Sequence, residues 1–347
     1  MRITQNSMSR RYLNNINRSL SDLSLSNQKL STGRNFFYMS DSVTRGTRAL
    51  GIRTQLYKNE QLQSNAKTVQ EELSIAEDNL TSVNEILQTI NGKVIAAQNG
   101  PNSQTELNIY ANEFEALRDA VLQFSNCTYD EKYIFGGTNN VSQPFTLNDA
   151  GELLYNGVAV NDVTYEDGVY RTSDGAKVPY SEDIFLDLGI GMRFTEGAVD
   201  KRTVVNSSVS GLKALGYGTT ELTYKDKNGE EATMAAPNNI YDLISSVSDA
   251  LRSNDVEKLS ALGGHLKERM GGVVAEIADI GVRYQFVDTN ISRLETEHLS
   301  LKEMSGNVEG VQDADEIVNY KSHQYAYSLV LQFGSTLVPQ SLMDFIH

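Results

Sequence analysis

Histidine and cysteine are the side chains of this sequence best suited to nucleophilic or metal chemistry. The four histidines are His265, His298, His323 and His347. None has another histidine three or four residues away, the spacing that places two metal ligands on one helix face. The single cysteine, Cys127, has no histidine near it in the sequence to lower the pKa of its thiol. These residues predict neither a metal site nor a catalytic nucleophile.

Clustered carboxylates are the next candidates. The acids of segment 162–167 offer the paired carboxyl groups that glycosidases use, but acids beside Gly168 more often form a turn. Asp313, Asp315 and Glu316 lack the glycine and later glutamate of a calcium loop, and a helix start favours negative charge. We therefore predict no cofactor and no enzyme. An enzymatic or glycan-binding β domain on a helical stalk remains an alternative.

The composition indicates an acidic protein without a membrane helix. Among 347 residues, 30 are Lys or Arg and 45 are Asp or Glu, which gives a net charge of -15 and argues against nucleic-acid or anionic-membrane partners. The mean hydropathy is -0.37, and no apolar run approaches the roughly 18 residues of a membrane span. Residues 1–11 lack the apolar stretch of a Sec signal peptide, so any export would use another route.

The charges are distributed unevenly along the chain. Residues 1–60 hold ten basic and three acidic side chains, whereas the chain from residue 261 onward holds six basic and twelve acidic ones. The two ends therefore carry opposite charge and could attract one another or a neighbouring subunit.

The strongest pattern is a series of apolar residues at alternating steps of three and four, which keeps one seam of a helix facing a partner. It runs from Leu62 to Ala97, stops before Gly100-Pro101, and resumes from Leu107 to Phe124, as in an antiparallel helical hairpin. A third segment, 266–301, has the same rhythm, with His298 as a polar notch in the seam. The expected core of this helical rod is Leu62, Val69, Leu73, Leu80, Val83, Leu87, Phe114, Leu117, Val121, Val273, Ile277, Ile280, Val287, Ile291 and Leu294.

Shorter seams lie at the two ends of the chain, and the only evident partner of each within the chain is the other. A contact between two such helices buries little area, so we predict that both ends are frayed or disordered in the free monomer and fold on assembly. The residues predicted to mediate self-assembly are Leu13, Ile16, Leu20, Leu23, Leu30, Tyr320, Tyr327, Leu331, Leu342 and Phe345.

Between Gly136 and Pro237 the helical period disappears and turn dipeptides replace it. Asn156-Gly157, Asp167-Gly168, Asp174-Gly175 and Asn228-Gly229 suit hairpin turns between segments rich in β-forming residues. We predict an α+β fold: a long antiparallel helical coiled-coil bundle built from both termini, with an inserted β-rich domain. The expected order is three helices, the insert and two helices.

Three regions follow from this pattern. Residues 1–45 with 313–347 would be the terminal assembly helices, 46–135 with 240–312 the helical rod, and 136–239 the outward-facing insert.

Several motifs at the two ends resemble the flagellin superfamily. They are Met1-Arg2-Ile3-Thr4-Gln5-Asn6, Gln28 to Arg34, Ser40-Asp41 with Arg45 to Arg53, Asp313-Ala314-Asp315 with Tyr320 to Leu329, and Ser341 to Ile346. Tyr133-Ile134-Phe135-Gly136-Gly137 is similar to the hook-associated branch of that family. The resemblance covers roughly 1–137 and 240–347, and it departs from the usual Pro-Ser-Asp-Asp-Pro of the family at Tyr38 to Val43.

The resemblance implies a structural subunit of the bacterial flagellum that joins the hook to the filament. It further implies contacts with copies of itself, a neighbouring hook-associated protein, flagellin on the filament side and a cytosolic export chaperone. The subunit would be exported unfolded through the flagellar type III channel to an extracellular position. The filament flagellin itself is an alternative, because it shares every terminal feature.

Overall fold

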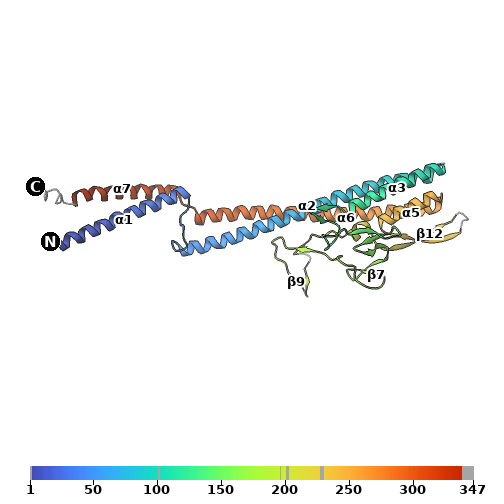
Figure 1. Cartoon of the computed structure of the whole chain (residues 1–347), viewed down its shortest axis with the longest axis horizontal. Coiled ribbons are helices and arrows are strands. Elements are labelled where there is room, and N and C mark those ends of the chain that lie inside the picture. The colour runs from blue at the N-terminus through green and yellow to red at the C-terminus, as the bar shows by residue number, and fades with distance from the viewer. Residues whose placement is uncertain (1, 101, 196, 201–202, 227–229, 338–347) are drawn as a thin grey trace. The chain divides into compact units, whose positions relative to one another are not determined.

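The computed structural model describes residues 2–100, 102–195, 197–200, 203–226 and 230–337 (Figure 1). The chain divides into two compact units. The terminal unit contains the residues up to Glu60 and those from Glu295 onward, and the middle unit is Gln61–Leu294. The two longest helices, α2 (Val43–Asn99) and α6 (Val256–Glu309), contribute to both units. The terminal unit thus reaches further along these helices than the predicted limits at residues 45 and 313.

The terminal unit is a small helical assembly. In it α1 (Arg2–Thr32) packs against α7 (Asp313–Leu337), while the first part of α2 packs against the last part of α6 (Figure 1). Its buried apolar cluster is small and consists of Ala49, Ile52 and Val308, with Phe36 and Leu56 packed against it.

In the middle unit, α2 and α6 pack with α3 (Gln104–Ser125) and α5 (Ile240–Arg252). The break predicted at Gly100-Pro101 lies between α2 and α3. The side chain of Ser103 accepts the backbone N–H of Glu106, and the Glu106 carboxylate accepts the backbone N–H of Ser103. This capping box satisfies two amide groups that the first turn of α3 would otherwise leave unpaired. The hydrogen bond from Ser103 also lowers the pKa of Glu106.

The expected order of helices missed two elements. Helix α5 packs closely along α3, and the short α4 (Gly211–Leu215) lies within the insert. The buried residues of α5 include Ile240, Leu243, Ile244 and Val247, spaced as on one face of a helix. That pattern could have been found in the sequence, where the turn at 253–255 separates α5 from α6.

The insert is built from short antiparallel hairpins rather than from one sheet. Asn156, Gly157, Asp167 and Gly168 all have positive φ, which confirms the turns predicted at these two dipeptides. Asn228-Gly229 lies outside the described residues. The strands are β1 (Thr128–Tyr129), β2 (Lys132–Tyr133), β3 (Phe145–Leu147), β4 (Leu153–Tyr155), β5 (Val158–Ala159), β6 (Val163–Glu166), β7 (Val169–Thr172), β8 (Phe185–Leu186), β9 (Phe194–Thr195), β10 (Ala198–Val199), β11 (Val205–Asn206), β12 (Thr219–Lys225) and β13 (Glu231–Pro237).

The insert and the helices of the middle unit share one apolar core. Phe145, Tyr155 and Leu212 of the insert are completely buried in the same cluster as Leu80 and Phe114 of the helices. The fold is therefore α+β, with long helices from both parts of the chain and an inserted domain of small sheets. None of the helices in the described part of the chain is long and apolar enough to cross a bilayer.

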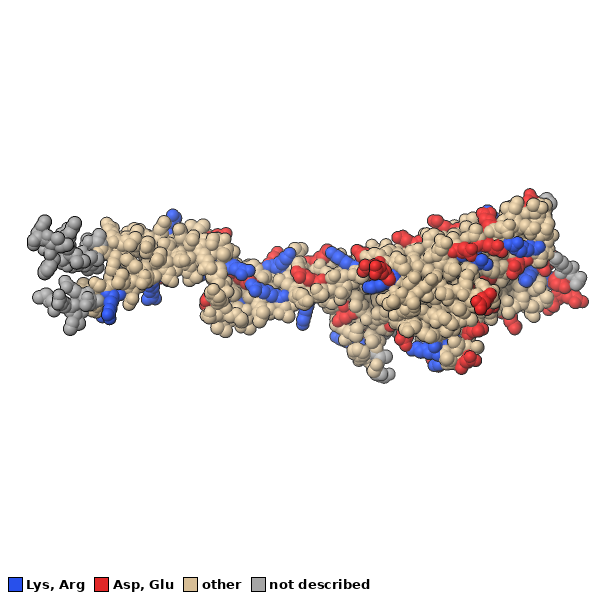
Figure 2. Space-filling model, in the orientation of Figure 1, with Lys and Arg blue, Asp and Glu red and all other residues tan. Residues whose placement is uncertain are grey.

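The two units differ in charge. The terminal unit has 12 Lys or Arg against 11 Asp or Glu, whereas the middle unit has 18 against 34. Asp and Glu side chains are spread over the face of the middle unit in Figure 2. The acidity of the chain therefore belongs to the middle unit.

Candidate functional site

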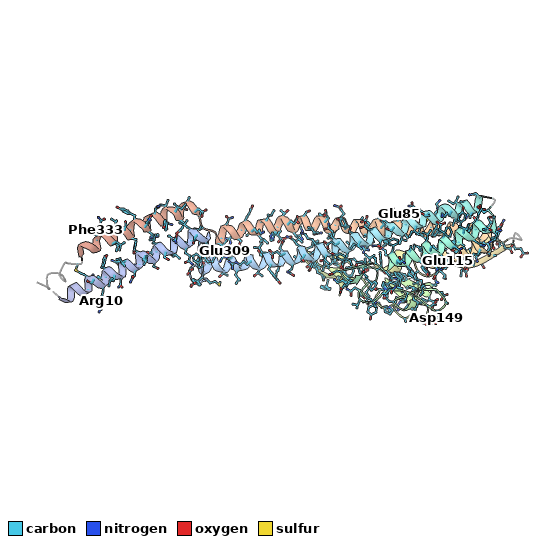
Figure 3. All side chains as sticks on the ribbon, turned by 45° about the horizontal axis from the view of Figure 1, so that its top comes forward. Arg10, Glu85, Glu115, Asp149, Glu309 and Phe333 are labelled. Atoms are coloured by element: carbon cyan, nitrogen blue, oxygen red, sulfur yellow. The ribbon has the colours of Figure 1, made fainter. Side chains whose placement is uncertain are left out.

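The predicted assembly residues that the structure describes lie on α1 and α7, two helices that pack against each other. The two helices run antiparallel, and Arg10 and Phe333 mark them in Figure 3. The hydroxyl of Tyr12 donates a hydrogen bond to the backbone oxygen of Val330 at 3.1 Å. A Cβ added to Gly334 would overlap that hydroxyl and the end of the ring. Only glycine at position 334 therefore lets Tyr12 lie across α7.

This crossing sets the register of the pair. Counting in opposite directions from Tyr12 and Gly334 places Ser19 opposite Tyr327 and Ser26 opposite Tyr320. Ser26 is buried, and both tyrosines are half-buried. At three levels of the seam, a small residue on one helix thus faces a tyrosine on the other. This alternation of small and large side chains allows two helices to approach closely.

The predicted assembly residues fall into two groups around this seam. Ile16, Leu23, Leu30, Tyr320 and Tyr327 are half-buried and lie along it. Leu13, Leu20 and Leu331 are exposed by 55%, 47% and 47%, because they lie one step away from it. Leu342 and Phe345 lie outside the described residues. Tyr12, Ser19, Ser26 and Gly334 complete the seam and were missed by the search for large apolar residues.

Other apolar side chains extend the exposed surface of the pair. On α1 and α7 the exposed residues further include Met8, Leu25, Ile317, Val318, Tyr325 and Phe333. A pair of helices with apolar residues facing outward on both members has more apolar surface than its own contact can cover. This surface is suited to packing against further helices.

A hydrogen-bonded clasp joins the end of α1 to the end of α6. The backbone N–H of Asn35 donates to the oxygen of Glu309 at 2.8 Å, and that of Val311 donates to the oxygen of Gly33 at 3.0 Å. Arg53 of α2 binds the Glu309 carboxylate with two of its nitrogens, and Glu309 is labelled in Figure 3. The hydrogen bond from Arg53 lowers the pKa of Glu309. These bonds hold the segment that follows α1, the end of α6 and the first part of α2 together at one place in the terminal unit.

The loop between α1 and α2 departs from the usual family motif, and one carboxylate organises it. Asp41 accepts the backbone N–H groups of Tyr38 and Phe37 at 2.9 and 3.0 Å. These two hydrogen bonds lower the pKa of Asp41. A single acid therefore closes this turn without the prolines of the family motif.

Comparison with known proteins shows what this chain resembles. Residues 3–140 match the bacterial flagellin N-terminal helical region. The chain is also 22% identical over 309 residues to flagellar hook-associated protein 3 of Salmonella typhimurium, with 77% of this chain and 95% of that protein covered. The chain is a flagellin-like protein.

Solved structures agree with the fold of this flagellin-like protein. A flagellar hook-associated protein of Vibrio parahaemolyticus is similar with a TM-score of 0.54 and 17% identity, over 78% of this chain and all of that one. Hook-associated protein 3 of Legionella pneumophila gives a TM-score of 0.51 and 14% identity, over 74% of this chain and 96% of that one. These relatives and solved structures are all named flagellar hook-associated proteins.

The expected rod core of the flagellin-like chain lies in the middle unit. Leu62, Leu117 and Ile277 are half-buried, and the other twelve residues of that set are buried. Leu73, Leu87, Phe114, Val121, Ile280, Val287 and Leu294 have no exposed surface. The long seam of α2 and α6 thus lies inside the fold.

The Phe135-Gly136-Gly137 motif anchors the insert to the helices. The backbone oxygen of Phe135 accepts the hydroxyl of Tyr155 at 3.1 Å and the N–H of Gly211 at 3.0 Å. Burial raises the pKa of Tyr155 to about 12, so its hydroxyl keeps its proton. Gly137 has a φ of +66°, and a Cβ there would overlap the oxygen of Tyr180. The motif is a structural connection in which glycine is required.

The groups that could do chemistry lie apart in the described part of the chain. Burial raises the pKa of the Cys127 thiol to about 11, which makes it unreactive at neutral pH. The acids at 162–167 are exposed, and Asp167 has the positive φ of a turn residue. Among the described residues, no group of three or more His, Cys, Asp or Glu could hold a metal ion. His347 lies outside those residues.

A polar cleft of about 570 Å³ lies between the insert and α6. Six of its charged side chains pair with one another: Lys213 with Glu276, Arg283 with Asp279, and Lys177 with Glu182. The seventh, Asp183, accepts a hydrogen bond from the side-chain amide of Asn206 at 2.8 Å. The described lining of the cleft therefore consists of three ion pairs and one hydrogen-bonded carboxylate among its charged groups.

Proposed function

We propose that the chain is a structural subunit of the bacterial flagellum that joins hook to filament through its terminal unit. The observation that carries the proposal is the outward-facing apolar surface on both α1 and α7, which includes Leu13, Leu20 and Leu331. Burial of apolar area drives most protein association. Copies arranged head to tail around a ring would cover these residues with helices of their neighbours.

Association of this kind would also order the ends of the chain. The α1–α7 seam contains serine and glycine as well as apolar residues, so the pair alone offers limited burial against the entropy of ordering two helices. Neighbouring subunits would supply the missing burial. In the junction role these neighbours are copies of the chain, a hook-associated protein on the hook side and flagellin on the filament side.

The proposal includes the route of export and the absence of catalytic activity. An unfolded chain with one cysteine cannot form an internal disulfide that would obstruct a narrow type III export channel. A cytosolic chaperone would cover the apolar residues of α7 before export. The protein would act extracellularly, would not depend on a Sec signal peptide, and would have no catalytic activity.

The proposal is tested with a strain that lacks the gene. We expect hooks that bear no filaments, and flagellin shed into the medium, because the junction is missing. The wild-type gene should restore filaments, and the Leu13→Asn, Leu20→Asn double variant should not. The matched control is Val141→Asn, which replaces an insert side chain that is 84% exposed. Full-length filaments in the null strain would rule out the junction role.

The number of copies on each flagellum distinguishes the junction role from the alternative, in which the chain is the filament subunit. A junction subunit is present as a short ring on each flagellum, whereas a filament subunit is present in thousands of copies. Quantitative mass spectrometry of purified flagella distinguishes the two, and a copy number comparable to that of the main filament protein would favour the alternative.

A further inference from the structure

The first part of α2 exposes a second row of apolar residues that the seam pattern of the long helices does not include. Val43, Leu50 and Tyr57 are exposed by 67%, 57% and 64%, and they follow one another at intervals of seven residues. All three belong to the terminal unit. An interval of seven keeps side chains on one face of a helix over four turns.

Two threonines make this row continuous. The hydroxyls of Thr47 and Thr54 donate to the backbone oxygens of Val43 and Leu50, each at 2.9 Å. These hydroxyls are satisfied within the helix, so the threonines can offer their methyl groups to a partner. The row 43-47-50-54-57 then has the steps four, three, four and three of a coiled-coil seam. We name these five residues the outer seam of α2.

The outer seam is separate from the seam that α2 already uses in the terminal unit. Ala49 and Ile52 are 3% and 4% exposed, and they pack with Val308 of α6. Gly51 lies beside the outer seam, and a Cβ on it would meet no heavy atom within 4 Å. Glycine inside a helix costs about 1 kcal/mol relative to alanine, and nothing in the described part of the chain requires it there. A helix of another molecule that approaches this face closely would require glycine at position 51, because a side chain there would hold the two backbones apart.

The charge of the segment indicates what kind of helix would fit. Between Asp41 and Glu60 the sequence has four cations, Arg45, Arg48, Arg53 and Lys58, and no acid. In the described part of the chain, Arg53 is engaged by Glu309, and no ion pair involves Arg48 or Lys58. Lys58 directly follows Tyr57 and therefore flanks the outer seam. An approaching helix with carboxylates beside its own apolar row would pair with these cations.

We propose that the outer seam of α2 binds a helix of a neighbouring subunit, with apolar residues at steps of three and four and carboxylates at the flanking positions. This inference rests on the junction role and adds to it a second contact surface, separate from α1 and α7. The same segment of a second copy is a poor occupant, because pairing two outer seams would bring Arg48 and Lys58 of one copy near those of the other without an acid of the segment between them.

The test uses the full chain and two synthetic helical peptides of 21 residues. Both carry Leu and Ile at steps of three and four. One has Glu at the flanking positions, and the other has Lys there. Fluorescence anisotropy of the labelled peptides should show at least tenfold tighter binding of the Glu peptide, a preference that shrinks in 1 M NaCl because salt screens exposed charges. Leu50→Asn should weaken binding of the Glu peptide at least tenfold, with an unchanged melting temperature, since Leu50 is exposed.

Leu299→Asn is the matched control, because Leu299 is a 63% exposed leucine of the terminal unit that lies on α6. It should leave peptide binding unchanged. Equal binding of the two peptides, no binding of either, or equal losses in the two variants would overturn the proposal. So would a dimer of the chain, seen in sedimentation, that Leu50→Asn abolishes. If the null strain confirms the junction role while neither peptide binds, only this inference fails.

Discussion

At the scale of single residues, two glycines carry contacts that no other residue could make. Gly137 combines a φ of +66° with a position where a Cβ would overlap the oxygen of Tyr180. We predict that Gly137→Ala destabilises the chain by about 2–4 kcal/mol, from backbone strain together with overpacking. Urea unfolding followed by circular dichroism measures it. Gly175→Ala, at a φ of +77° with open space around its Cβ position, should cost only the strain of about 1–2 kcal/mol. Equal effects would show that the contact with Tyr180 is unimportant.

Gly334 acts in a helix, where replacing glycine with alanine normally stabilises by about 1 kcal/mol. Because a methyl group there would overlap the ring of Tyr12, we predict that Gly334→Ala displaces this ring, breaks its hydrogen bond to Val330, and weakens both the contact between α1 and α7 and assembly. Gly92→Ala is the control, since Gly92 lies in α2 with open space around its Cβ position. Combining Gly334→Ala with Tyr12→Ala should cost less than the two single effects added together. Additive effects, measured by helicity and by incorporation into flagella, would contradict the crossing.

At the scale of elements, the clasp between the ends of α1 and α6, with the ion pair from Arg53 of α2 to Glu309, predicts a pH dependence of the terminal unit. Its ion pair lowers the pKa of Glu309 below its ordinary value of 4.5. The stabilisation is therefore fully present above about pH 4.5, and it is lost as the pH falls through the lowered pKa. We expect the protection factors of the amides of Asn35 and Val311, which correct for the slower intrinsic exchange of acid solution, to fall on acidification in that range. Arg53→Gln should lower these protection factors at pH 7 and remove most of their acid dependence.

The matched control for this prediction is Lys177→Gln, which breaks the exposed ion pair with Glu182 in the insert. It should leave the exchange of both amides unchanged. An Arg53→Gln protein that keeps the full acid dependence would show that another group is responsible. Asp41 is the next candidate, because its pKa is lowered by hydrogen bonds in the same unit.

How far the sequence predicts these elements depends on what each seam is made of. Leu73 and Leu87 of α2 could be placed in the core because their neighbours at three and four steps are also apolar. In the terminal seam, Leu13 and Leu20 lie one step away from the contact between α1 and α7, whose positions include Tyr12, Ser19 and Ser26. A search for apolar residues at steps of three and four passes over serine, because serine is polar. Serine becomes a contact residue here only because a tyrosine lies opposite it on the facing helix. That complementarity belongs to two helices at once, so a single segment does not reveal it.

At the scale of the whole molecule, the two units are stabilised to very different degrees. The middle unit has one large core to which α2, α3, α5, α6 and the insert all contribute. The terminal unit has three buried apolar residues in its cluster and many exposed ones on α1 and α7. Local opening costs least where buried apolar contacts are few. A subunit that is stable in its middle and weakly held at its ends can remain a monomer until neighbours cover those ends.

Hydrogen exchange of the free chain and of assembled flagella tests this difference directly. In the free chain we expect rapid exchange in α1 and α7 and slow exchange between residues 62 and 97 of α2, because only the latter segment lies in the large core. In assembled flagella α1 and α7 should become protected, while the middle unit changes little, since its core is complete before assembly. The Leu13→Asn, Leu20→Asn variant should match the wild type as a free chain and differ only in its failure to assemble. Slow exchange of α1 and α7 in the free monomer would mean that their own contact suffices to order them, and that assembly joins ends already folded.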